Sequence, residues 1–203
     1  MTFERAAAGH EHLDELSSGL FALRRELRRL EGWSTLLGAT LLAGGRLLAA
    51  GNGGSAAQAQ HLTAELVGRY RDERPPLSAI ALHAETSSLT AIGNDYGADE
   101  AYARQVRAHG RPGDVLVALS TSGASANVLA AVEAANEMEM RTWALAGSSD
   151  CPLAELCDDA VCVEAPSTAT VQECHLVAVH IICAGVDAHV ASVGASASAA
   201  GLA

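Results

Sequence analysis

The residues best suited to metal or acid/base chemistry are a histidine and a glutamate four positions apart, His61 and Glu65. Residues i and i+4 share one face of an α-helix, and both side chains can bind zinc or exchange protons. In isolation such a pair is more often a surface or capping contact. Gln172 and His180 would also share a helix face, although His180 among aliphatic neighbours is equally typical of a core histidine. Spacing alone does not bring the two segments together.

A second chemical feature is a hydroxyl-rich segment, residues 120–125, which follows an apolar run and precedes a helical one. The hydroxyls of Ser120, Thr121, Ser122 and Ser125, with N–H groups at a helix start, can cradle a phosphate without a cationic side chain. The alternative is a turn with an N-cap, because a single serine before a helix is usually a cap. Four hydroxyls in six residues exceed what capping needs, and we expect a phosphate site.

The third feature is a glycine-rich segment, residues 51–57, which contains Asn52, Gly53, Gly54 and Ser55. Its glycines permit positive φ and close backbone approach, so the loop can meet an anion or a polar ligand. It also satisfies the loose dinucleotide fingerprint, but no clear acidic residue ends the next apolar run. A Walker loop is excluded because no lysine follows the glycines. A further polar cluster, residues 94–97 with Asn94 and Asp95, predicts by itself only a turn.

Short apolar runs that alternate with helix-length segments must position these residues. The runs are Leu47–Ala50, Leu77–Leu82, Val115–Leu119, Thr142–Ala146 and Ala160–Val163. Buried parallel strands are apolar on both faces and are joined by crossover helices. We therefore predict an α/β fold over residues 46–190, a three-layer α/β/α sandwich with a parallel, doubly wound sheet of about five strands. Function is then expected at the carboxyl ends of the strands.

Both ends of the chain read as helical. Leucines recur at three- and four-residue steps over residues 10–48. Because Gly19, Gly32 and Gly38 favour a break or bend, we predict two helices within the N-terminal segment 1–48, the second ending near Gly44. The basic run 24–29 predicts a solvated helix face or a subunit contact. A last helix is expected over about residues 171–190, followed by a disordered low-complexity tail, residues 191–203.

Composition narrows the function. The 203 residues include 24 acidic and only 13 basic ones, for a net charge of −11, which argues against a nucleic-acid partner. Aromatic residues make up 3%, so stacking platforms are scarce and small polar ligands fit best. The five cysteines contain no C-x-x-C pair and read as reduced thiols. No basic and apolar leader begins the sequence, and no apolar run reaches the roughly 18 residues of a membrane span, so we expect a soluble cytoplasmic protein with no membrane partner.

Taken together, these motifs resemble the phosphoheptose isomerases of the sugar-isomerase (SIS) fold, over about residues 12–190. The matching segments are Gly51-Asn52-Gly53-Gly54-Ser55, Ala59-Gln60-His61, Ala64-Glu65-Leu66, Leu89-Thr90-Ala91-Ile92-Gly93-Asn94-Asp95-Tyr96-Gly97, Ser120-Thr121-Ser122-Gly123 and Gln172-Glu173. As a set they are specific for this branch, whereas the serine-rich loop alone would indicate only the broader fold.

The resemblance implies an aldose–ketose isomerase that converts sedoheptulose 7-phosphate to D-glycero-D-manno-heptose 7-phosphate, an early step toward nucleotide-activated heptose. It further implies a homotetramer, with packed N-terminal helices and active sites near subunit interfaces. One zinc ion per subunit would be held by His61, Glu65, Gln172 and His180. Phosphate would bind at Ser120, Thr121, Ser122 and Ser125, and Asn52, Gly53, Gly54, Ser55, Asn94, Asp95 and Gln172 would line the sugar.

The chemistry of such a reaction suits these residue types. Moving a carbonyl from C2 to C1 requires a proton to be removed and returned through an enediol(ate), and a carboxylate such as Glu65 can carry it. His180 is suited to protonating oxygen or opening the sugar ring. Glu65 would then serve both as a metal ligand and as the proton carrier, a division that the sequence does not decide.

Ala169 departs from the family pattern, in which this position is commonly an aspartate near the sugar. Substrate preference or rate is therefore open, and an isomerase of another sugar phosphate is one alternative. A second is the related non-catalytic tetramer that binds the replication initiator, although that branch typically lacks the glutamate and histidine found here as Glu65 and His180. A nucleotide-dependent oxidoreductase, the third, explains neither the serine-rich loop nor the two side-chain pairs.

Overall fold

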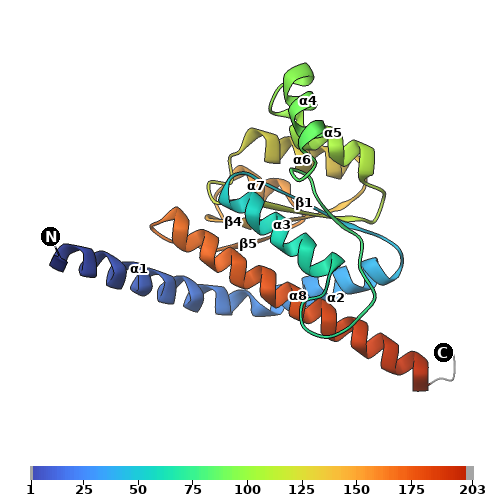
Figure 1. Cartoon of the computed structure of the whole chain (residues 1–203), viewed down its shortest axis with the longest axis horizontal. Coiled ribbons are helices and arrows are strands. Elements are labelled where there is room, and N and C mark those ends of the chain that lie inside the picture. Colours follow the sequence, from blue (N-terminus) through green and yellow to red (C-terminus); the bar gives the residue numbers. More distant parts are fainter. Residues whose placement is uncertain (1, 200–203) are drawn as a thin grey trace.

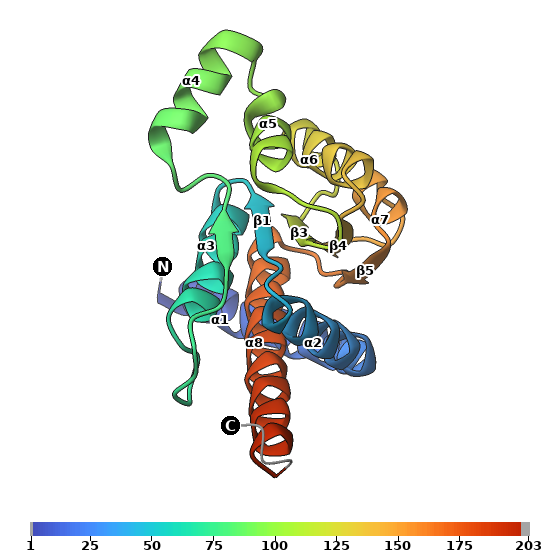
Figure 2. The same cartoon turned by 90° about the vertical axis from the view of Figure 1, so that its right-hand side faces the viewer.

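A parallel five-stranded sheet lies at the centre of the computed structural model, which describes residues 2–199 and the side chains of residues 8–196 (Figures 1 and 2). The strands are β1 (Leu47–Gly51), β2 (Ala79–Ala81), β3 (Val115–Ser120), β4 (Arg141–Ala146) and β5 (Asp159–Cys162). Their order is β2-β1-β3-β4-β5, with every pair parallel. The predicted sheet is confirmed, although β2 is shorter than the apolar run that predicted it.

Both faces of the sheet are covered because its strands are apolar at successive positions. Leu47 and Val115 point into a core formed with α2 (Leu27–Leu42), α3 (Gly54–Val67) and α8 (Thr168–Ala199). Leu48 and Leu116 point into the opposite core, formed with α5 (Glu100–His109), α6 (Ala126–Glu137) and α7 (Pro152–Leu156). The molecule is therefore the predicted three-layer α/β/α sandwich.

The strand order reverses between β1 and β3. From β1 the chain crosses to the edge strand β2, and it then returns past β1 to form β3 and the strands beyond it. In such open sheets the ligand crevice lies outside the carboxyl ends of the strands at this switch point. The glycine-rich loop leaves β1 there and the serine-rich loop leaves β3, because Gly51 and Leu119 are partners in the parallel ladder.

The N-terminal segment forms two helices as predicted, but the expected break at its glycines is wrong. α1 (Thr2–Leu23) and α2 are joined by a 3-10 turn, Arg24–Glu26, and the second helix ends at Leu42, close to the predicted Gly44. Gly19 and Gly38 lie inside helices. They are glycines because a Cβ would lie 2.8 Å from Cys174 Sγ at position 19 and 2.7 Å from His189 Cδ2 at position 38. Here glycine permits close packing on α8 and does not end a helix.

The last helix is longer than predicted. The prediction of a disordered tail is wrong for residues 191–199, which are helical. α8 runs from Thr168 to Ala199, and residues 200–203 lie outside the described part. Alanine is the strongest helix former, so an alanine- and serine-rich sequence can extend a helix that packing has already begun.

Among the described helices, only α8 is long and apolar enough by composition to cross a membrane. One of its faces is buried in the core through Cys174, Val179, Ile182 and Val186. A core helix passes the same test of length and composition, so this feature is weak evidence for a membrane span.

Candidate functional site

The sheet domain brings His61 and Glu65 on α3 against His180 on α8. The Nε2 atoms of His61 and His180 lie 3.0 Å apart, and His61 Nε2 lies 3.2 Å from Glu65 Oε1. The two histidines are 119 positions apart in sequence. All three side chains are partly exposed, so a ligand can reach them, and His180 is therefore not the fully enclosed core histidine of the alternative interpretation.

Tyr70 lines this group, although no motif predicted it. Its ring centroid lies 5.7 Å from that of His180 with the planes tilted by 31°, while the His61 ring meets His180 edge to face at 5.1 Å. His180 therefore has an aromatic neighbour and an imidazole neighbour, and together these limit the directions in which its ring can turn.

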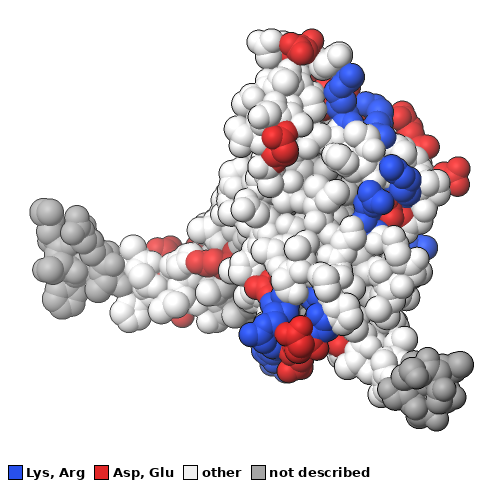
Figure 3. All heavy atoms as spheres, turned by 45° about the vertical axis from the view of Figure 1, so that its right-hand side comes forward, with Lys and Arg blue, Asp and Glu red and all other residues white. Residues whose placement is uncertain are grey.

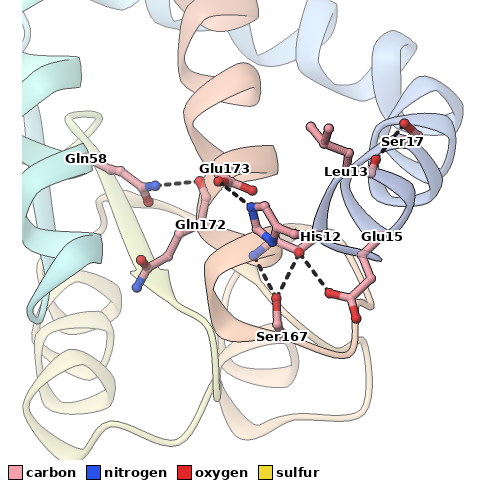
Figure 4. Close-up of polar contacts among 9 residues, drawn as sticks. His12, Leu13, Glu15, Ser17, Gln58, Ser167, Gln172 and Glu173 are labelled. Atoms are coloured by element: carbon pink, nitrogen blue, oxygen red, sulfur yellow. Dashed lines mark hydrogen bonds and ion pairs between the residues drawn. The ribbon is translucent and has the colours of Figure 1, made fainter. Parts of the chain in front are cut away.

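Gln172, the fourth predicted zinc ligand, lies apart from the other three. Its side-chain amide lies over the start of α3, where a Cβ on Gly54 would approach its Oε1 to 2.5 Å. Its backbone carbonyl accepts a hydrogen bond from Gln58 Nε2 (Figure 4). Gln172 and His180 are two turns apart on α8, or about 12 Å along the helix axis. The structure thus places Gln172 beside the glycine-rich loop.

The structure brings together only part of the predicted zinc-ligand set. In the portion of the chain that the structure describes, no three His, Cys, Asp or Glu side chains form a group that could hold a metal ion as they stand. His180, His61 and Glu65 make a chain of contacts through one nitrogen of His61 and do not surround a common point. Their donor types nevertheless match the His₂Glu set of catalytic zinc sites.

Apart from Gln172, polar residues at the start of α8 contact α1 and so hold the two helices together. His12 Nε2 lies 3.0 Å from Glu173 Oε1, and this contact joins α1 to α8 (Figure 4). Thr170 Oγ1 contacts Ser167 Oγ and Glu15 Oε2. In the same turn Ala169 is exposed and presents no carboxylate.

The serine-rich loop is shaped by its own hydroxyls. Ser120 Oγ lies 3.2 Å from Ser125 Oγ and 3.4 Å from Ser122 Oγ, and it accepts a hydrogen bond from the N–H of Gly123. Gly123 has a φ of +64°, which favours glycine. Ser125 stands at the N-cap of α6, yet its side chain makes no capping bond. Its hydroxyl turns toward Ser120, so the capping alternative does not account for it.

Thr121, which is half-buried, completes this loop. Its carbonyl oxygen would lie 2.3 Å from a Cβ at position 147, so only glycine fits there. The loop therefore packs tightly against the segment that follows β4.

The glycine-rich loop begins α3 and exposes polar groups beside the switch point of the sheet. Gly53, at the N-cap of α3, has a φ of +53°, and Ser55 is buried in the first turn. Asn52 is exposed and is held by two residues that sequence reasoning missed, Tyr102 on α5 and Asn127 on α6. Burial raises the pKa of the Tyr102 phenol, which therefore stays protonated and donates.

Asn94 and Asp95 occupy the last turn of α4 (Thr86–Tyr96), which projects away from the sheet (Figure 2). Both are exposed, and Asn94 Nδ2 donates to Asp95 Oδ1 at 2.8 Å. Glu85 caps this helix by accepting from the N–H groups of Ser87 and Ser88, and these bonds lower the pKa of its carboxyl. The structure does not bring Asn94 and Asp95 against the other predicted site residues.

The parallel sheet, its switch point between β1 and β3 and the serine-rich loop define a SIS domain protein, and the SIS domain family model matches residues 12–147. A phosphoheptose isomerase of Streptomyces coelicolor is 67% identical over 177 residues, which is 87% of this chain and 77% of that protein. Another, from Thiobacillus denitrificans, is 53% identical over 78% of this chain and 82% of that protein. The chain thus belongs to the phosphoheptose isomerase family.

Solved structures agree with this assignment. A phosphoheptose isomerase from Neisseria gonorrhoeae superposes with a TM-score of 0.81 at 42% identity, covering 93% of this chain and all of the other. A second, from Francisella tularensis, gives a TM-score of 0.80 at 34% identity, covering 92% of this chain and 98% of the other. The helices outside the sheet are therefore part of the shared architecture as well.

Proposed function

We propose that this protein is an aldose–ketose isomerase that converts sedoheptulose 7-phosphate to D-glycero-D-manno-heptose 7-phosphate, early in the biosynthesis of nucleotide-activated heptose. The observation that carries the proposal is the meeting of Glu65 and His61 on α3 with His180 on α8. It places a carboxylate and two imidazoles together between α3, which the glycine-rich loop begins, and α8.

Glu65 is the group that moves the proton. With C1 and C2 of the open-chain sugar beside it, its carboxylate takes a proton from C1 of the ketose and returns it to C2. The intermediate is an enediol(ate), in which negative charge develops on oxygen. His180, held between the Tyr70 and His61 rings, supplies or accepts the proton at that oxygen and at the ring oxygen when the cyclic sugar opens.

The phosphate end of the substrate binds at Ser120, Thr121, Ser122 and Ser125. The start of α6 supports this assignment, because N–H groups and a positive helix end attract an anion. Ser125 adds a hydroxyl that no capping bond occupies. Asn52, Gly53, Gly54, Ser55 and Gln172 line the sugar between the two ends, together with Asn94 and Asp95.

We also propose one zinc ion per subunit, which His61, Glu65 and His180 would hold, with the Gln172 amide as the fourth ligand. Two imidazoles and a carboxylate are donor types that zinc prefers. His61 Nε2 lies 3.0 Å from His180 Nε2 and 3.2 Å from Glu65 Oε1, so these three donors are already neighbours. When bound, zinc supplies positive charge that stabilises a developing oxyanion.

The assembly we propose is a homotetramer in which α1 and α8 pack against other copies and place active sites near the interfaces. Supporting this, Leu13, Phe21, Leu27 and Val177 are large apolar side chains left exposed on the N-terminal helices and α8. Three of them, Phe21, Leu27 and Val177, line a cavity of about 400 Å³ together with Leu20, Leu23 and Ile181. The sugar phosphate substrate supports a cytoplasmic location.

The non-catalytic scaffold is the less favoured function, because it would need neither Glu65 nor His180, and the two meet around His61. A role on nucleic acid has no support on the visible face of the molecule, where basic side chains lie among acidic ones (Figure 3).

The test is NMR detection of product from sedoheptulose 7-phosphate, with metal-replete enzyme, chelator-treated enzyme and Glu65→Gln. We expect an aldoheptose 7-phosphate, loss of turnover on chelation with recovery on adding zinc, and no turnover by the variant. The matched control is Glu133→Gln, which makes the same chemical change at an exposed carboxylate on α6 and should keep wild-type turnover. No conversion by folded, zinc-replete wild type would refute the activity and would favour the scaffold or another sugar phosphate.

A further inference from the structure

The amide side chains of Asn52 and Asn127 form a reciprocal pair between the loops that follow β1 and β3. Asn52 Nδ2 donates to Asn127 Oδ1 at 2.8 Å, and Asn127 Nδ2 donates back to Asn52 Oδ1 at 2.9 Å. Asn127 was not among the site residues predicted from the sequence. Because the two residues are 75 positions apart, this contact exists only in the folded protein.

The pair joins the start of α3 to the start of α6. Asn52 lies directly before the N-cap of α3, whose later turns bear His61 and Glu65. Asn127 is the second residue of α6 and lies two positions after Ser125, the last residue of the serine-rich loop. The bridge therefore spans the switch point between β1 and β3, where a ligand is expected to lie.

Tyr102 on α5 holds the Asn52 side of this bridge through its hydroxyl group. Its hydroxyl lies 2.7 Å from the Gly51 carbonyl oxygen and 3.1 Å from Asn52 Oδ1, and its single proton is shared between them. The ring is buried at 3% exposure, so its position is fixed by the core. The oxygen of Asn52 is thereby fully used by Tyr102 and Asn127.

The two amide side chains keep donors and an acceptor that are free to bind a ligand. Each amide nitrogen carries two protons, and the pair uses one from each. One N–H of Asn52 and one of Asn127 stay available, as does one lone pair on Asn127 Oδ1. Both residues are at least partly exposed, so these groups face solvent or ligand. They suit the hydroxyl oxygens in the middle of a polyol chain.

We propose that Asn127 is a positioning residue that holds the glycine-rich loop at a fixed distance from the phosphate loop, and thereby sets the carbon-chain length that the enzyme prefers. This inference rests on the proposed isomerase function. When the serine-rich loop holds the phosphate, the sugar hydroxyls meet the polar groups of the glycine-rich loop only if the carbon chain matches the separation that the amide bridge fixes. Loosening the bridge removes this constraint while the phosphate hydroxyls stay in place.

The experiment compares wild type with Asn127→Leu, which keeps the side-chain size but removes both hydrogen bonds. Three quantities are measured: the KM for sedoheptulose 7-phosphate, and the inhibition constants of D-fructose 6-phosphate and of inorganic phosphate. We expect the preference for the seven-carbon over the six-carbon sugar phosphate to fall about tenfold, the effect of losing roughly 1.4 kcal/mol of selective binding. Inhibition by inorganic phosphate should stay within about twofold, since no phosphate-binding hydroxyl changes.

Two controls keep the outcomes separate. Glu133→Gln on the same helix should leave all three constants unchanged. Tyr102→Phe removes only the hydroxyl and should lower the preference in the same direction by a smaller factor; it replaces Asn127→Leu if that variant does not fold. An unchanged preference, whether nothing weakens or all three ligands weaken in parallel, overturns the proposal. Absence of wild-type turnover would instead overturn the isomerase function, independently of the bridge.

Discussion

The guanidinium of Arg74 and the carboxylate of Asp187 form a buried ion pair that joins the segment after α3 to α8. Arg74 Nε lies 2.7 Å from Asp187 Oδ1, and the two side chains are only 5% and 10% exposed. The same guanidinium donates to the backbone carbonyls of Glu65 and Leu66 at the end of α3. One arginine thus connects the helix of His61 and Glu65 to the helix of His180.

Asp187→Ala is expected to destabilise the fold by about 3 kcal/mol, because it leaves the Arg74 charge buried without its partner. Urea unfolding measures this loss. The matched control is Arg107→Ala, which removes an exposed ion pair with Glu100 whose side chains are 46% and 40% exposed. That change should cost less than about 1 kcal/mol. Equal, small losses in both variants would contradict a structural role for the buried pair.

His180→Gln is expected to lower kcat by about 10²- to 10⁴-fold, the usual contribution of a positioned acid/base group. Circular dichroism and the melting temperature should stay close to wild type, because His180 is only partly buried. Tyr70→Phe keeps the ring against His180 and serves as the control, with activity within a few-fold of wild type. Wild-type turnover by His180→Gln would return this residue to the role of a packed histidine.

Much of the fold could be predicted because the signals are local. Apolar runs such as Val115–Leu119 followed by helix-length segments fix a parallel sheet, and the sheet then fixes the edge at which function lies. The glycines of the N-terminal helices were misleading, since the reason for Gly19 is a cysteine of α8 that is distant in sequence. Local propensity favours a break where tertiary packing requires a small residue.

In the candidate site, too, the residues linked by local sequence spacing could be predicted, and those linked only by tertiary contacts could not. Spacing identified His61 with Glu65 and the hydroxyls around Ser122, because each group is contiguous or lies on one helix face. Tyr102 and Asn127 act through partners 50 and 75 positions away, and no spacing rule links them to Asn52. Such contacts arise from topology, which brings the loops after β1 and β3 together.

Ser125→Ala is expected to raise the KM for the sugar phosphate about tenfold with little change in stability. The hydroxyl makes no capping bond to α6, so its loss removes a ligand contact and leaves the helix start intact. Steady-state kinetics and thermal unfolding measure the two effects. Ser17→Ala, an exposed serine bonded to the Leu13 carbonyl one turn earlier, is the control and should alter neither. A lower melting temperature with unchanged KM would identify Ser125 as a cap instead.

His175 makes the stability of the fold depend on pH. The side chain is fully buried, its Nε2 lies 3.1 Å from the Ala146 carbonyl oxygen, and burial lowers its pKa from 6.5 to about 4. Above pH 6.5 the residue is neutral in both folded and unfolded chains, so it imposes no penalty. As pH falls below 6.5 the unfolded chain takes up the proton first, and stability declines until the pH approaches 4.

The expected loss from this residue is about 2 kcal/mol between pH 7 and pH 5, approaching about 3 kcal/mol near pH 4. It is measured as the difference in unfolding free energy between wild type and His175→Gln, in which the amide can still donate to Ala146 but has no charge to gain. Other titrating groups are common to both proteins and cancel in the difference. If the two proteins lose stability in parallel as the pH falls, His175 is not the residue that makes the fold acid-sensitive.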